Sequence, residues 1–94
     1  MVWFYIFYNG YLPYACVGLL KNEVRFFFID ISYRKKRYVQ SVLYFINKKT
    51  NNNWFVGTTK KNNRFVEFAN KNQWSVFVEN DNEIIFKICQ QEEF

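Results

Sequence analysis

We expect the rest of the sheet to form around the stretch Val24–Tyr33, VRFFFIDISY. In a β-strand, alternate side chains point to opposite faces. Both faces of this stretch are mainly apolar, with Val24, Phe26 and Phe28 on one and Phe27, Ile29, Ile31 and Tyr33 on the other. A strand that is apolar on both faces is typical of the centre of a sheet with cover on both sides. We therefore expect a central strand here, with Phe28 buried.

The segment before this strand predicts two more strands. Asn9 and Gly10 lie between two apolar runs, which is a strong hairpin signal because both central residues of a type I′ turn need a positive φ. We expect strands at residues 2–8 and 11–20, and a second tight turn at Lys21 and Asn22. Pro13 has no N–H, so we place it at a sheet edge or a bulge.

The first 20 residues carry no charged side chain, as in the apolar part of an export signal or a membrane helix. A signal peptide would begin with basic residues and end at small ones, and this segment does neither. A membrane helix would carry Asn9, Gly10 and Pro13 through its middle, and its aromatic residues favour strands. The sequence therefore predicts a hairpin and no membrane association.

The segment that follows the central strand can be interpreted in two ways. Val39, Val42, Leu43 and Ile46 have the spacing of one helical face. Tyr38, Tyr44 and Phe45 favour strands. We favour one central helix near residues 35–47, which makes the fold α+β. The alternative is an all-β small barrel or sandwich.

The second half of the chain reads as four short strands, at residues 54–59, 64–69, 74–79 and 83–90, separated by polar turns. In the last hairpin, alternation predicts two buried rows: Trp74, Val76 and Val78, and Ile84, Phe86 and Ile88. Phe77 and Ile85 form a small apolar patch on the other face. The prediction is a single domain over residues 1–94, with an antiparallel sheet of about six to seven short strands in two meanders.

The residue types exclude most catalytic chemistry. The chain contains no histidine, so the common nucleophile pairs and zinc ligand sets are missing. The three glycines are isolated, so no glycine-rich phosphate loop is present. Cys16 and Cys89 form no metal-binding or redox motif, and they are either two buried thiols or a disulfide. We expect no enzyme activity, no metal and no cofactor.

One segment points to nucleic acid. The basic run Arg34, Lys35, Lys36 and Arg37 is bracketed by Tyr33 and Tyr38, and a groove that binds single strands combines cations with stacking rings. Lys48, Lys49 and Trp54 could extend such a groove. The net charge of +5 and the pI near 9.3 suit an anionic partner, although they also serve solubility. Nucleic-acid binding is therefore the alternative function.

The apolar composition favours self-association instead. Half of the residues are hydrophobic and 23% are aromatic, more than one sheet and one helix can cover. Large exposed apolar patches usually mark an interface, and two-fold dimers are the commonest way to bury one. We expect a small structural or interaction protein that forms a homodimer and binds a protein partner through an apolar sheet face, with Phe77 and Ile85 at the interface. Its composition fits an A/T-rich viral or phage genome, and we expect it in the cytoplasm, of the host cell if it is viral.

Overall fold

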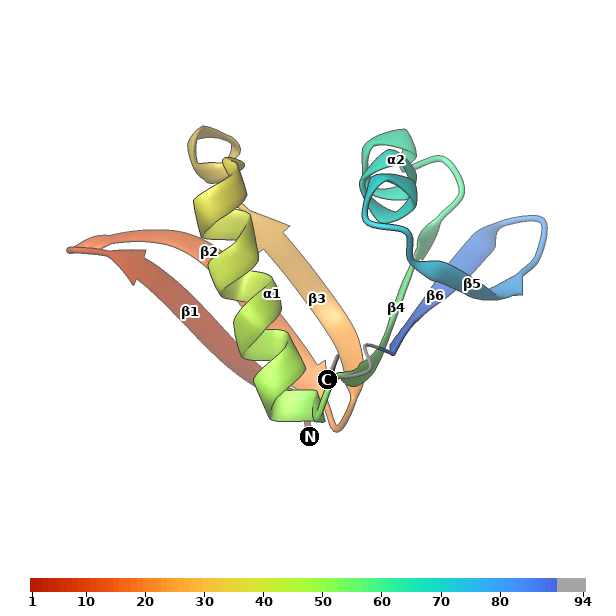
Figure 1. The fold of residues 1–94 in the computed structure, drawn as a ribbon, viewed down its shortest axis with the longest axis horizontal. Coiled ribbons are helices and arrows are strands. Elements are labelled where there is room, and N and C mark those ends of the chain that lie inside the picture. The colour runs from red at the N-terminus through yellow and green to blue at the C-terminus, as the bar shows by residue number, and fades with distance from the viewer. Residues whose placement is uncertain (90–94) are drawn as a thin grey trace, which may run out of the picture.

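The computed structural model describes residues 1–89, except for the side chain of Cys89, and shows an open six-stranded mixed sheet with two helices (Figure 1). The α+β prediction is confirmed, and the alternative of a closed barrel or sandwich is not what the chain forms. The elements in chain order are β1 (Trp3–Asn9), β2 (Leu12–Leu20), β3 (Glu23–Ile29), a 3-10 turn (Ile31–Tyr33), α1 (Lys36–Thr50), β4 (Asn53–Thr59), α2 (Asn63–Lys71), β5 (Ser75–Glu79) and β6 (Glu83–Cys89).

The sheet consists of two antiparallel halves that meet at one short parallel junction. Its strand order is β1-β2-β3-β4-β6-β5. Only Glu23 and Val24 of β3 pair with β4, opposite Phe55 and Val56, and the Phe55 N–H donates to the carbonyl of Asn22 at 2.9 Å. The expectation of a fully antiparallel sheet is wrong here. Because α1 carries the chain back to the starting end of β3, β4 must run parallel to β3.

β3 is central in the sheet, as predicted, but its two faces are not those that simple alternation gives. Leu19 pairs with Val24 and Gly18 pairs with Phe26, so Arg25 is the extra residue of a β-bulge. The bulge puts Val24 on the same face as the residues after it at odd positions, Phe27 and Ile29. Phe26 and Phe28 then lie on the other face, where both are exposed. The prediction of a buried Phe28 is therefore wrong.

β3 also ends earlier than predicted. The strand stops at Ile29, and the Asp30 N–H donates to the carbonyl of Tyr14 at 2.7 Å. The Asp30 carboxylate accepts a hydrogen bond from the Ser32 N–H at 2.9 Å, and this caps the 3-10 turn. Ile31 and Tyr33 consequently leave the sheet.

The predicted helix is α1, which extends to Thr50 and buries Val42 and Ile46 against the sheet. Asn51 ends it in the left-handed conformation, which asparagine adopts more readily than most residues. The second helix, α2, is a correction, because residues 64–69 were predicted as a strand. The Asn62 side chain accepts a hydrogen bond from the Phe65 N–H at 3.3 Å, and this N-cap begins the helix.

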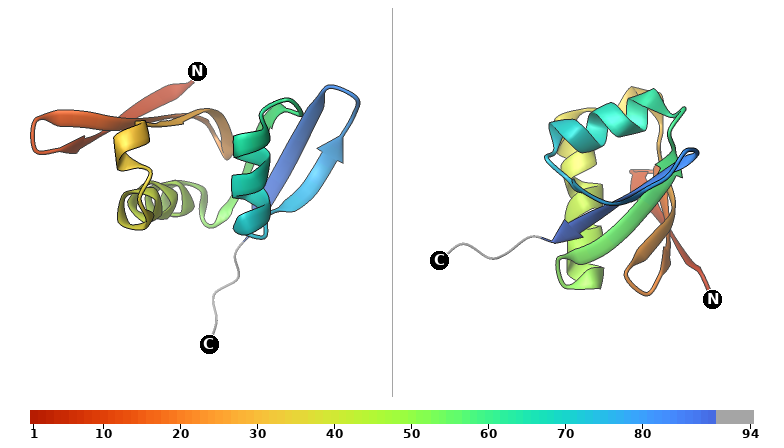
Figure 2. Two further views of the ribbon diagram at one scale, coloured as in Figure 1. Left: turned by 90° about the horizontal axis from the view of Figure 1, so that it is seen from above. Right: turned by 90° about the vertical axis from the view of Figure 1, so that its right-hand side faces the viewer.

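Both helices lie on the same face of the sheet (Figure 2). α1 covers β1–β3, where Phe45 contacts Tyr5 and Phe7. α2 covers β4 and β6, where Phe65 contacts Phe86. Neither described helix is long and apolar enough to cross a membrane. Within residues 1–89, no helix lies on the opposite face of the sheet.

The core fills the space between the helices and the sheet. Its largest fully buried side chains are Trp54 and Phe86. The predicted buried row on β6 is confirmed, since Ile84, Phe86 and Ile88 are all buried. The prediction of a second buried row is wrong for Val76 and Val78 of β5, because both are exposed. Trp74, just before β5, does pack on the core. β5 is an edge strand, and a bulge at Phe77 shifts its register.

Pro13 lies beside a bulge, which confirms one of its two predicted positions. Phe7 pairs with Ala15 and Tyr8 pairs with Pro13, so Tyr14 is the extra residue in β2. The Tyr14 ring is buried, with its centroid 5.1 Å from that of Tyr33 and 5.2 Å from that of Tyr38. Burial raises the pKa of Tyr14 above its ordinary 10.0, and the nearby Tyr38 raises this pKa further.

This pKa shift predicts an alkaline loss of stability. Because the pKa of Tyr14 is higher in the folded state, its ionisation favours the unfolded chain. The contribution of the protonated Tyr14 hydroxyl to the free energy of unfolding is complete below pH 10.0 and is lost as the pH rises through the folded pKa. Tyr14→Phe has no such group, so its unfolding free energy should fall less steeply above pH 10.0 in urea titrations. Tyr44→Phe, on an exposed ring, is the control and should follow the parent. Identical pH profiles for Tyr14→Phe and the parent would contradict the assignment.

Candidate functional site

The sheet face that the helices leave open is the candidate site. On its N-terminal half, five large apolar side chains are 47% to 61% exposed. We call this set the N-terminal apolar face: Phe4, Ile6, Tyr8, Phe26 and Phe28. The alternation of β1 and the bulge at Arg25 bring these side chains to one side of three adjacent strands.

Small residues of β2 form the floor of the N-terminal apolar face. Gly18 pairs with Phe4 on one side and Phe26 on the other, and the two ring centroids lie 6.3 Å apart. A Cβ at Gly18 would lie 2.9 Å from the Phe4 ring and 3.1 Å from the Phe26 Cβ. The absent side chain therefore lets the rings meet above β2. Cys16, a half-buried free thiol, occupies the next floor position, between Ile6 and Phe28.

The apolar surface continues to the edge of the sheet. β1 is an edge strand, and it contains no proline and no charged side chain. Proteins usually protect such edges with charges, proline or bulges. Trp3 on this strand and Tyr11 and Leu12 at the hairpin tip are also exposed. This surface is not the interface expected from the sequence, although the uncharged first 20 residues indicate it.

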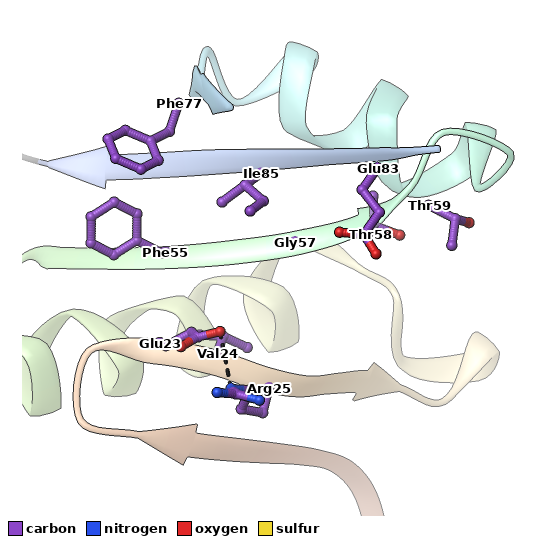
Figure 3. Close-up of a pocket in the computed structure, with 10 residues that line it drawn as sticks. All are labelled: Glu23, Val24, Arg25, Phe55, Gly57, Thr58, Thr59, Phe77, Glu83 and Ile85. Atoms are coloured by element: carbon purple, nitrogen blue, oxygen red, sulfur yellow. Dashed lines mark ion pairs between the residues drawn. The ribbon is translucent and has the colours of Figure 1, made fainter. Parts of the chain in front are cut away.

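The interface residues predicted from the sequence, Phe77 and Ile85, lie on the same open face in the C-terminal half (Figure 3). They line a hollow of about 500 Å³ with Phe55, whose ring centroid is 5.0 Å from that of Phe77. On β3, across this hollow, Arg25 and Glu23 form an ion pair at 2.9 Å. Phe77 is exposed and Ile85 is half-buried.

The basic run lies around the start of α1 and does not form one groove. The Arg34 Nε donates to the carbonyl of Ile29 at 2.8 Å. Arg37 donates to the Tyr38 hydroxyl at 2.6 Å, and its guanidinium lies 4.6 Å from the centre of that ring. Lys35 and Lys36 are exposed. Tyr33 and Tyr38 pack against each other and Tyr14, with all three rings in contact.

The residues predicted to extend this groove lie elsewhere. Lys48 and Lys49 are in the last turn of α1, where their ammonium groups lie over the rings of Tyr44 and Tyr5. Trp54 is 1% exposed, and its indole N–H donates to the Asn47 side chain at 2.8 Å. A base has no access to a ring buried in this way. The structure therefore separates the predicted nucleic-acid residues.

Among residues 1–89, no group of three His, Cys, Asp or Glu side chains is placed to hold a metal ion. The carboxylates that the structure pairs with cations are Glu23 with Arg25 and Glu79 with Lys60, both at the surface. No known protein family matches the chain, and no curated protein is detectably similar to it. The function must therefore be argued from these surfaces.

Proposed function

We propose that this is a small non-enzymatic protein that self-associates, with a second copy docked on the N-terminal apolar face. One observation carries the proposal: Phe4, Ile6, Tyr8, Phe26 and Phe28 are about half exposed on the side of the sheet that carries no helix. Contiguous exposed patches beyond a few hundred Å² are rare in monomers and usually mark an interface. The partner that covers this face is the same face of a second copy of the chain.

The area of the surface suits a dimer. An aromatic side chain buries roughly 200 Å², so five side chains at half exposure offer about 500 Å² per copy. Two copies would therefore bury roughly 1,000 Å² in total, which is the lower limit for a specific interface. A two-fold arrangement sets the same patch on both copies face to face.

Charge also favours this face over the rest of the surface. The chain carries a net charge of +5, so two copies repel each other at most orientations. The first 20 residues, which form β1 and β2, contain no charged side chain. Two copies can therefore approach through this half of the sheet with the least like-charge repulsion. The basic run at the start of α1 lies outside the proposed interface.

A charge inserted in the N-terminal apolar face tests the proposal. Phe26→Asp would place two carboxylates in the dimer interface without their water, and it should weaken dimerisation by roughly 100-fold or more. Sedimentation velocity over a concentration series measures the change. Ile31→Asp is the matched control, because Ile31 is exposed but lies in the 3-10 turn, off this face. The control should dimerise like the parent.

The other outcomes are equally informative. A parent chain that sediments as a monomer at every concentration would show the proposal to be wrong. A dimer that survives Phe26→Asp but dissociates in Phe77→Asp would move the interface to the hollow at Phe55, Phe77 and Ile85. Circular dichroism of each variant shows whether the fold is intact.

A further inference from the structure

A second hollow lies between the two helices, where β3 and β4 separate. The two strands pair only at Glu23–Phe55 and Val24–Val56, and beyond these pairs they diverge (Figure 1). After the carboxyl end of β3 the chain leads to α1, which lies over β1–β3. After the carboxyl end of β4 it leads to α2, which lies over β4 and β6 on the same face of the sheet (Figure 2). In open sheets, ligands bind in crevices at the carboxyl ends of parallel strands.

This inter-helix hollow has a volume of about 640 Å³, within the usual range for small-molecule sites. β3 contributes Phe27, Phe28 and Ile29, and Arg34 before α1 and Val39 in its first turn complete this side. The remaining side chains come mainly from one face of α2, where the spacing of three, four and seven residues aligns them: Arg64, Glu67, Phe68 and Lys71.

The charge of the inter-helix hollow is positive. Arg34, Arg64 and Lys71 face one carboxylate, that of Glu67. Within residues 1–89, the ion pairs of the structure are Arg25–Glu23 and Lys60–Glu79, so none of these three cations is paired. The bond from the Arg34 Nε to the Ile29 carbonyl, 2.8 Å long, fixes the base of the guanidinium. The hollow thus presents three cations that an anion can engage.

Aromatic rings line the same hollow. Phe27, Phe65 and Phe68 are half-buried, and their ring centroids lie 6.2 to 6.4 Å apart. Rings that are partly open beside arginine and lysine can stack on a planar base while the cations neutralise phosphate. This set was not predicted from the sequence, because residues 64–69 were expected to form a strand, and only a helix aligns Arg64 with Lys71.

We propose that the inter-helix hollow binds a nucleotide unit, with its phosphates at Arg34, Arg64 and Lys71 and its base against the phenylalanine rings. The unit is either a free nucleotide or one nucleotide of a single strand, because both present the same phosphate and base. The self-association surface lies on the other face of the sheet, and Phe28 of β3 is the residue that borders both sites. Arg34 is the one residue that the inter-helix hollow shares with the basic run.

Two double variants with the same loss of charge test the site. Arg64→Gln with Lys71→Gln removes two cations of the hollow, whereas Lys48→Gln with Lys49→Gln removes two cations from the far end of α1. The probes are ADP, by isothermal titration calorimetry, and a fluorescent oligothymidylate, by anisotropy over a salt series. The hollow variant should bind at least about tenfold more weakly, and its salt slope should flatten by about 1.4 for two lost single-strand contacts. The control should stay within about threefold of the parent, since distant exposed charges are screened.

Phe68→Leu separates base recognition from phosphate recognition. It keeps an apolar side chain but removes the ring, so it should weaken ADP about tenfold and leave inorganic pyrophosphate unchanged. Binding of ADP identifies a free nucleotide as a ligand, and binding of the oligonucleotide alone identifies a strand; both support the site. Failure of the parent to bind either probe would overturn the proposal. An equal loss of affinity in the two double variants would also overturn it, because general charge attraction would then explain the binding.

Discussion

Trp54→Ala is expected to lower the free energy of unfolding by about 3 to 5 kcal/mol, the usual cost of truncating a buried aromatic side chain. Trp54 is 1% exposed, and its ring packs against Trp74 with a centroid distance of 5.2 Å. Its indole N–H also donates to Asn47, so it ties β4 to α1. Truncation leaves a cavity and removes this hydrogen bond in the same place. Urea denaturation followed by circular dichroism measures the loss.

Trp3→Ala is the matched control, because Trp3 is 63% exposed at the edge of the sheet. Measured at a concentration where the chain is monomeric, its unfolding free energy should lie within roughly 0.5 kcal/mol of the parent value. Equal losses for Trp3→Ala and Trp54→Ala would contradict the assignment of the core to the helix-covered face.

Phe86→Ala is expected to have a similarly large effect, again about 3 to 5 kcal/mol. Phe86 is fully buried in β6, and its ring lies 6.4 Å from that of Phe65 and 6.2 Å from that of Trp74. These contacts hold α2 against the C-terminal half of the sheet. Truncation should therefore destabilise α2 together with the strands, and hydrogen exchange of the α2 amides reports this.

Phe77→Ala is the control for Phe86→Ala. Phe77 is 57% exposed on the open face, and its one edge-to-face contact with Phe55 is worth about 1 kcal/mol. A loss for Phe77→Ala as large as that for Phe86→Ala would mean that the open face is covered within a single chain.

Local signals predicted part of the fold well. Gly10 supports the first hairpin, although the loop residues are Gly10 and Tyr11, and the positive φ is at Gly10. The helical spacing of Val39, Val42, Leu43 and Ile46 predicted α1 and outweighed its β-favouring side chains. The alternation of β6 predicted its buried row. In each case the signal comes from residues that are close together in the sequence, and tertiary contacts do not override it.

Two of the errors arise from features that depend on pairing between distant segments. The bulge at Arg25 exchanges the faces of β3, and only the register against Leu19 and Gly18 reveals it. The parallel junction at Val24 and Val56 follows from where α1 returns the chain. The misassigned strand at residues 64–69 is a local error, because the nine residues of α2 contain strand-favouring Phe and Val, and its capping residue, Asn62, was read as part of a turn.

For the candidate site, too, local signals were readable from the sequence and features that depend on strand pairing were not. The sequence predicted an apolar sheet face but placed it at Phe77 and Ile85, because the alternation of the last hairpin is easy to read. The larger surface needs Phe4 of β1 and Phe26 of β3 on one side, and their meeting across Gly18 depends on both strand registers. A surface built by three strands cannot be assigned from any one of them.

The mass of the parent chain in solution shows whether two copies associate. Light scattering coupled to size-exclusion chromatography, at micromolar concentration, should give twice the chain mass of 11.6 kDa. Dilution should shift the peak toward the monomer, as expected for a reversible dimer. A mass of 11.6 kDa at every concentration, with no binding of a dye that reports exposed apolar surface, would contradict the claim that the N-terminal apolar face holds a second copy.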